Sequence, residues 1–379
     1  MLRHGGELFL IRSRPCLTIL VVSVLFGCGV PSNVSPMTQP PSEFLYAATQ
    51  NGITAFPLNA STGALGTGSL ATSVLASNFF LSNMVSDSAG KFLFACGLYN
   101  SSIEAFSINS KSGALAPISG STLPLPGLGA CNLSIDATGK FLYTATSAGV
   151  SAFTVNAATG ALSAIAGSPF SDGSVLRESV MDPFGKFLYA ISNTTLNTIS
   201  VFAINSSSGV LTPIAGSPFQ LPIAGVAYSM AVHPSGKFLY VSFPQTEQIA
   251  AWSVNSSTGV LTIVPGSPFV SGVVSGDAPN GLVVAPSGEF LYAWSGGTSV
   301  FGFSVDANSG ALSAMNLSPF TLNSENLAID PTTRFLYAGQ GNSVGGFNIN
   351  VSTGALTAFA SPPVATAGVT LLTVVKTSQ

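Results

Sequence analysis

Charged side chains are scarce in this chain, and their scarcity excludes whole classes of partner. Asp, Glu, Lys and Arg make up 7% of the 379 residues, against roughly a quarter of an ordinary globular protein. The formal net charge is −3, and no cluster of Lys and Arg occurs in the body of the chain. Because binding to a phosphate backbone depends on such clusters, we expect no nucleic-acid partner.

Histidine and cysteine are almost as rare. Beyond residue 28 the chain holds one histidine, His233, and two cysteines, Cys96 and Cys131. A Cys/His zinc cluster cannot be built from these, and no second histidine can serve a Ser/His or Cys/His pair. No EF-hand-like run and no phosphate-binding P-loop occurs either. We therefore expect no metal and no cofactor.

The first 28 residues have the features of a targeting segment. Arg3, Arg12 and Arg14 precede the apolar run from Leu17 to Phe26, which is too short to span a bilayer. The run ends in Leu25-Phe26-Gly27-Cys28, which resembles a bacterial lipobox, in which the cysteine is lipidated and becomes the first mature residue. An ordinary secretory signal with a chance cysteine is the alternative.

These features predict three segments: a signal peptide with a lipobox (1–28), a Pro/Ser-rich linker (29–42) and one folded domain (43–379). The protein is then expected in the bacterial cell envelope, facing the periplasm or on the cell surface, and attached to the membrane only through a lipid on Cys28. Such a location permits a disulfide between Cys96 and Cys131. We nevertheless expect two buried free thiols, because sequence shows no geometry for a bridge.

A sevenfold internal repeat with a period of about 45 to 52 residues runs through the body of the chain. One element reads F-L-Y or F-L-F and begins at Phe44, Phe92, Phe141, Phe187, Phe238, Phe290 and Phe335. Another reads [ST]-G-[AV]-L, with its glycine at Gly63, Gly113, Gly160, Gly209, Gly259, Gly310 and Gly354. A repeat of this length argues for one repetitive domain and against two or three separate ones.

Each repeat predicts four short antiparallel strands joined by tight turns. In the last repeat these are residues 326–330, 335–338, 344–349 and 356–360. The F-L-Y strands are apolar on both faces, which suits sheets packed between two other sheets. Seven such sheets fit an all-β, seven-bladed β-propeller better than a β-helix, whose coils are shorter. No strand precedes Phe44, so the segment 369–375 is expected to pair with 44–47 and close the ring.

Three sequence features resemble the lactonase-type seven-bladed propellers. The first is a turn followed by K-F-L-Y, as in Asp182-Pro183-Phe184-Gly185 and His233-Pro234-Ser235-Gly236. The other two are the motifs F-x-[IV]-N and S-T-G-x-L. That family includes 6-phosphogluconolactonases and cycloisomerase-like proteins, and the resemblance covers roughly residues 43–376. It implies lactone hydrolysis at the mouth of the central channel, where the family tends to carry arginine and histidine. Here the matching positions read Cys131-Asn132, Arg177-Glu178 and Tyr228-Ser229, so the arginine is kept and the histidines are not.

Comparison of the seven repeats separates residues that build blades from residues free for function. His233 stands in the slot that Asp87, Asp136, Asp182 and Asp330 fill in other repeats, so it is expected to build a turn. Residues outside the shared slots are expected in the variable loops of one face. They are Tyr99, Asp172, Arg177, Glu178, Tyr228, Glu247, Asp277 and Glu325.

Four residues before the first position of the tight turn, the repeats carry a set of residues rich in asparagine. We expect these residues at the mouth of the central channel. We predict ligand contacts from Asn83, Tyr99, Asn132, Tyr228, Ser229, Asp277, Asn280, Glu325 and Asn326. Each of them can instead cap a strand end or hold channel water, and that alternative stays open. The predicted catalytic pair is Arg177 and Glu178, with Glu178 activating water and Arg177 polarising a carbonyl.

Two functions are compatible with this pattern. A monomeric binding module would hold a small polar ligand, a glycan or an envelope protein on its variable loop face, which the nearly uncharged surface favours. A lactone hydrolase, as the resemblance implies, would use Arg177 and Glu178. Without the histidines we favour the binding module and keep the hydrolase as the alternative.

Overall fold

A computed structural model describes residues 41–49, 51–72, 81–97, 101–120, 122–127, 131–192, 197–221, 223, 225–270 and 278–378. The chain divides into two units, 1–36 and 37–379. The predicted signal peptide, Cys28 and the linker up to residue 40 lie outside the described residues, as do Tyr99 and Asp277. Among those described, no helix is both long and apolar enough to cross a membrane.

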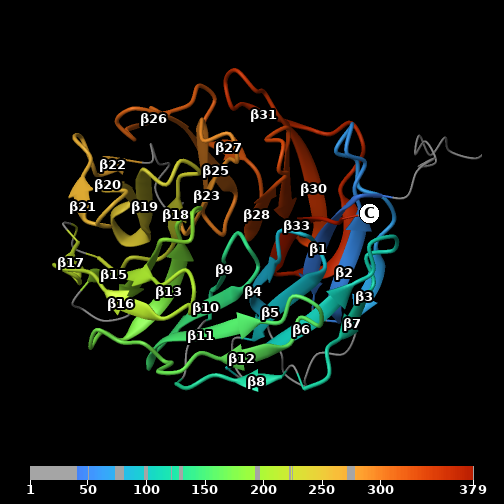
Figure 1. The fold of residues 1–379 in the computed structure, drawn as a ribbon. Coiled ribbons are helices and arrows are strands. Elements are labelled where there is room, and N and C mark those ends of the chain that lie inside the picture. Colours follow the sequence, from blue (N-terminus) through green and yellow to red (C-terminus); the bar gives the residue numbers. More distant parts are fainter. Residues whose placement is uncertain are drawn as a thin grey trace, which may run out of the picture. The chain divides into compact units, whose positions relative to one another are not determined.

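Residues 43–376 form seven antiparallel sheets, which we call blades 1 to 7 (Figure 1). Blade 1 consists, from its inner edge outward, of β33 (Leu371–Lys376), β1 (Glu43–Thr49), β2 (Gly52–Pro57) and β3 (Ser69–Thr72). Blade 2 has β4 (Leu81–Ser86), β5 (Phe92–Gly97), β6 (Ser102–Ile108) and β7 (Leu115–Pro117). Blade 3 has β9 (Leu133–Ile135), β10 (Phe141–Thr146), β11 (Gly149–Val155) and β12 (Leu162–Ala164).

The remaining blades repeat this order. Blade 4 has β13 (Leu176–Met181), β14 (Phe187–Ser192), β15 (Thr198–Ile204) and β16 (Leu211–Pro213), and blade 5 has β18 (Met230–Val232), β19 (Phe238–Phe243), β20 (Gln248–Val254) and β21 (Leu261–Ile263). Blade 6 has β23 (Gly281–Val284), β24 (Phe290–Trp294), β25 (Ser299–Val305) and β26 (Leu312–Ala314), and blade 7 has β28 (Asn326–Ile329), β29 (Phe335–Gly339), β30 (Gly341–Ile349) and β31 (Leu356–Ala358).

The innermost strands follow one another in a closed ring. In Figure 1, β33, β4, β9, β13, β18, β23 and β28 surround the centre of the folded unit, and each contacts the next, with β28 returning to β33. The seven-bladed propeller predicted from the repeat is confirmed.

The ring closes through strands from the two ends of the folded unit. β33 pairs antiparallel with β1, with Phe44 opposite Val375 and Ala47 opposite Leu372. The predicted closure is therefore confirmed, except that Val369 belongs to the preceding strand, β32 (Val364–Val369), which pairs with β30.

Five blades carry an additional short strand that the repeat pattern did not predict. These strands pair with the start of the third strand and are β8 (Leu123–Pro124), β17 (Phe219–Gln220), β22 (Phe269–Val270), β27 (Phe320–Thr321) and β32. A 3₁₀ turn, η1 (Pro244–Thr246), connects β19 to β20.

In blades 2, 3, 4 and 7 the tight turn between the first two strands is held by the side chain of the aspartate at its first position. In blade 4, Oδ1 of Asp182 accepts the backbone N–H of Phe187 at 2.8 Å. His233 fills this slot in blade 5, where its Nδ1 lies 2.7 Å from Oγ of Ser235 and its Nε2 lies 2.8 Å from the carbonyl oxygen of Gly288. The expectation that His233 is a turn residue is confirmed.

Neighbouring blades are joined by a contact that uses both repeated motifs. The phenylalanine of each F-L-Y or F-L-F strand covers the hairpin glycine of the next blade: a Cβ on Gly63 would lie 2.5 Å from the ring of Phe335. In five blades the tyrosine two places later donates its hydroxyl to that glycine's carbonyl, as Tyr337 does to Gly63 at 2.8 Å. Equivalent hydrogen bonds join Tyr46 to Gly113, Tyr143 to Gly209, Tyr240 to Gly310 and Tyr292 to Gly354.

We predict that Tyr337→Phe lowers the free energy of unfolding by about 1 kcal/mol, because the buried carbonyl of Gly63 loses its partner. The matched control is Tyr189→Phe, since the buried hydroxyl of Tyr189 has no hydrogen-bond partner among the described residues. Denaturant titration should show a cost for the first variant only. Equal costs would show that the hydroxyl of Tyr337 is not what joins blades 7 and 1.

Candidate functional site

A cavity of about 460 Å³ opens where the seven inner strands begin. Every blade contributes to its lining, and nine of the residues predicted from the sequence line it: Asn83, Asn132, Arg177, Glu178, Tyr228, Ser229, Asn280, Glu325 and Asn326. We call this space the inner-strand cavity. Its volume lies in the range of small-molecule sites.

Arg177 and Glu178 do not lie in a variable loop, as the sequence had suggested, but in the inner strand β13. Successive residues of a regular strand point to opposite faces. The pairing of β13 with β14 shifts register between Leu176 and Glu178, which leaves Arg177 as the extra residue of a β-bulge. A bulge re-aims side chains, and here it lets two adjacent charged residues both line the cavity.

The side chain of Arg177 is positioned by blade 5. Its guanidinium lies 4.1 Å from the centroid of the Tyr228 ring, and Nη1 donates to the carbonyl oxygen of Ala227 at 3.4 Å. Tyr228 is 43% exposed, so this cation–π pair stands at the edge of the cavity, open to solvent. Stacking fixes the plane of the guanidinium, and its remaining N–H groups can bind an acceptor.

Glu178 is also held by blade 5. Its Oε1 accepts the backbone N–H of Met230 at 3.0 Å and the hydroxyl of Ser229 at 3.4 Å. Burial raises the pKa of Glu178 to about 7, while the hydrogen bonds from Met230, Ser229 and Asn132 and the charge of Arg177 oppose the rise. A carboxyl group with a pKa near 7 can both accept and donate a proton at neutral pH.

Glu178 stands where other blades use an uncharged oxygen to join the inner strands. Oδ1 of Asn83 accepts the N–H of Leu133 at 3.2 Å, and Oδ1 of Asn326 accepts that of Leu372 at 3.0 Å. Oγ of Ser229 accepts the N–H of Leu282 at 3.4 Å. These three side chains tie blades 2, 5 and 7 to the next blade, so the strand-capping alternative is correct for them; they nevertheless also line the cavity.

Trp294 was missed by the sequence argument. It lies in the cavity lining at the end of β24, in a slot that holds Ala48, Cys96, Ala145, Ile191, Ser242 or Gly339 in the other blades. Its indole occupies the space where a Cβ on Gly281 would lie. The repeat does contain a signal for this contact. Trp294 is the largest residue in its slot, and Gly281 is the smallest residue in the slot that lines the channel mouth, and both occur in blade 6.

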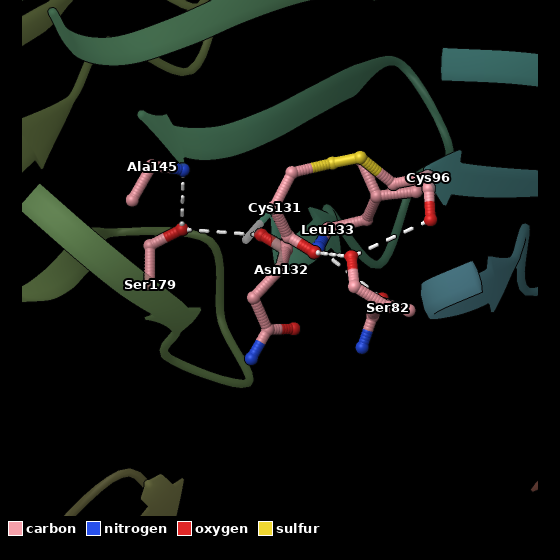
Figure 2. The surroundings of a disulfide bond; sticks show 8 residues. Ser82, Cys96, Cys131, Asn132, Leu133, Ala145 and Ser179 are labelled. Atoms are coloured by element: carbon pink, nitrogen blue, oxygen red, sulfur yellow. Dashed lines mark hydrogen bonds between the residues drawn. A yellow bond between two sulfur atoms is a disulfide. The ribbon is translucent and has the colours of Figure 1, made fainter. Parts of the chain in front are cut away.

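The two cysteines lie beside the cavity and form a disulfide, so the expectation of free thiols is wrong. Cys96 in β5 and Cys131 before β9 belong to adjacent blades, and their Cα atoms are 6.1 Å apart. Figure 2 shows the bond together with Ser82, whose hydroxyl donates to the carbonyl of Cys131 at 2.7 Å, and with Asn132, whose side chain extends away from the sulfurs. The expected burial of both cysteines is confirmed.

Within the described ranges no group of three or more His, Cys, Asp or Glu is arranged to hold a metal ion. Fold and site together define a seven-bladed propeller with one polar cavity at the start of its inner strands. The model of the lactonase family, described as a seven-bladed β-propeller, matches residues 126–226 and 227–373. The chain therefore belongs to this family.

Solved structures with the same fold are distant in sequence. A candidate 6-phosphogluconolactonase from Bacteroides fragilis is 20% identical with a TM-score of 0.73, over 90% of this chain and 100% of that one. The periplasmic gluconolactonase PpgL of Pseudomonas aeruginosa is 15% identical with a TM-score of 0.70, over 89% and 99%. At these identities the likeness shows the fold alone. No curated protein matches the sequence.

The raised pKa of Glu178 makes stability depend on pH. A carboxyl group with a folded-state pKa near 7 and an ordinary value of 4.5 binds protons more tightly when folded. Its contribution to stability is complete below about pH 4.5 and is lost as the pH rises through 7. Glutamine stays uncharged and can still accept the Met230 N–H, so Glu178→Gln should match the wild type at pH 4.5.

At pH 8 the same variant should be more stable than the wild type by about 1 to 2 kcal/mol, a value reduced for partial exposure to the cavity. Thermal unfolding at both pH values measures the difference. Glu289→Gln, which removes an exposed carboxyl group at the opposite end of the blades, is the matched control. A Glu178→Gln effect that is the same at pH 4.5 and pH 8 would contradict the assignment.

Proposed function

We propose that the inner-strand cavity binds a small polyhydroxylated lactone or the corresponding sugar acid. The observation that carries this proposal is the convergence of Arg177, Glu178 and amide side chains from several blades on one cavity. Amides and hydroxyls suit the hydroxyl groups of a sugar, and Trp294 and Tyr228 offer flat apolar surface to its C–H faces. The names of two structural neighbours, both lactonases, favour the same ligand class.

Hydrolysis of the bound lactone is the reaction that the cavity can support. Ionised Glu178 would take a proton from water as the water oxygen attacks the lactone carbonyl carbon. Arg177 would stabilise the negative charge that develops on the carbonyl oxygen. The ring C–O bond then breaks, the protonated Glu178 returns its proton to the leaving oxygen, and an open-chain hydroxy acid is released.

The non-catalytic binding module, which the sequence alone favoured, is here the second candidate, and one observation supports it. Oε1 of Glu178 accepts a backbone N–H of the next blade, as the asparagines of the ring do. A carboxylate used only in this way would join blades and bind ligand without moving a proton.

We predict that Glu178→Gln lowers kcat for glucono-1,5-lactone by about 10² or more with little change in KM, the loss expected for a general base. The kcat/KM of the wild type should rise with pH and level off above about pH 7, as Glu178 ionises. Stopped-flow acidification corrected for the uncatalysed rate measures both quantities. A pure binding module would instead show no turnover above background, with affinity weakened by Arg177→Ala or Tyr228→Ala.

We also propose that the protein is exported and lipid-anchored at Cys28. The disulfide between Cys96 and Cys131 supports export, because such bonds persist in oxidising compartments. In a bacterial host, Cys28→Ala should move the folded protein from the membrane fraction to the soluble fraction. Cys16→Ala, in the same leader, is the matched control and should remain with the membrane. Continued membrane association of Cys28→Ala would contradict the proposed lipid attachment at Cys28.

A further inference from the structure

Positive charge in the folded unit is confined to one end of the blades, with a single exception. Seven of its eight cations lie at the end opposite the inner-strand cavity, where the tight turns and outer hairpins are: Lys91, Lys111, Lys140, Lys186, Lys237, Arg334 and Lys376. A strand of six residues separates the two ends by roughly 15 Å. The exception is Arg177, in the cavity.

The loops outside the described ranges cannot supply a second cation. Residues 50, 73–80, 98–100, 121, 128–130, 193–196, 222, 224, 271–277 and 379 contain no Lys, Arg or His. Within residues 41–379, Arg177 is therefore the only Lys or Arg side chain at the cavity end of the blades.

Arg177 is itself balanced by acidic groups. Glu178 and Glu325 both line the cavity, and Glu325 is exposed at its edge. Part of the hydrogen-bonding capacity of Arg177 is already used by the carbonyl oxygen of Ala227, and its face is covered by Tyr228. The fixed charge around a ligand is therefore near zero or negative.

A phosphate monoester needs a different environment. It carries about −1.5 to −2 charges at neutral pH, and proteins bind it with several Arg or Lys side chains, helix N-termini or metal ions. No α-helix occurs in the described part of the chain, so no helix N-terminus faces this cavity there. One arginine beside two carboxyl groups provides too little positive charge for a dianion.

We infer that the cavity selects unphosphorylated, neutral sugar lactones and discriminates against their 6-phosphorylated counterparts. The inference rests on the proposed function, since it specifies which lactones that function concerns. Uncharged hydroxyl groups lose little free energy on entering a cavity of amides, hydroxyls and aromatic rings, because these groups replace their hydrogen bonds to water. A phosphate group loses its hydration without gaining cationic partners.

The test compares glucono-1,5-lactone with 6-phosphoglucono-1,5-lactone on the wild-type protein at low ionic strength. Turnover is measured by acidification, and affinity is measured by calorimetry with gluconate and 6-phosphogluconate, which do not hydrolyse. We expect at least a tenfold preference for the unphosphorylated member in kcat/KM or, for a protein that only binds, in affinity. A preference for the phosphorylated member overturns the inference and leaves the proposed function standing. No binding of either overturns both.

A charge change at the edge of the cavity gives a second, independent readout. Glu325→Lys should shift the ratio of phosphorylated to unphosphorylated affinity by about tenfold toward the phosphorylated ligand, because it exchanges repulsion for attraction. Glu325→Gln should shift the ratio in the same direction by less, and 0.5 M NaCl should remove most of the shift. A ratio unchanged by Glu325→Lys at low salt would show that charge in the cavity does not set selectivity.

Discussion

The contact of an aromatic strand with the hairpin glycine of the next blade is the interaction on which the rest of this structure depends. The phenylalanine ring lies where a Cβ of the glycine would be, so only glycine fits, and the glycine also has a positive φ, as at Gly63 with φ 71°. The contact recurs at all seven interfaces, and five add a tyrosine hydroxyl bonded to the glycine carbonyl. A protein so poor in charge is thereby held together by packing and buried neutral hydrogen bonds.

This scaffold leaves the starts of the inner strands free to vary. There, side-chain oxygens of Asn83, Ser229 and Asn326 tie blades 2, 5 and 7 to the next blade, and blade 4 uses the carboxyl group of Glu178 instead. The replacement keeps the inter-blade hydrogen bond to Met230 and adds a titrating group. Its burial costs stability above neutral pH and, in the function that we propose, supplies a base in the same pH range.

Three features of the site depend on contacts between separate chain segments, whereas a sequence pattern describes one segment at a time. Arg177 was expected in a loop, but a β-bulge extends the inner strand through it. Cys96 and Cys131 were expected to be free, but adjacent blades bring their Cα atoms to 6.1 Å. Trp294 was overlooked because its role depends on Gly281 across the strand pair.

The amino-acid pattern alone predicts the seven blades, the closure by the last strand, the turn role of His233 and half of the residues that line the cavity. These follow because turns, strand alternation and repeat length are local properties of the chain. Only the tertiary structure decided that the F-L-Y and glycine motifs meet between neighbouring blades, that the cysteines are bonded, and that Arg177 faces the cavity without a second cation. Such contacts depend on how close the folded blades bring residues that are far apart in the sequence, and a local sequence pattern does not determine that distance.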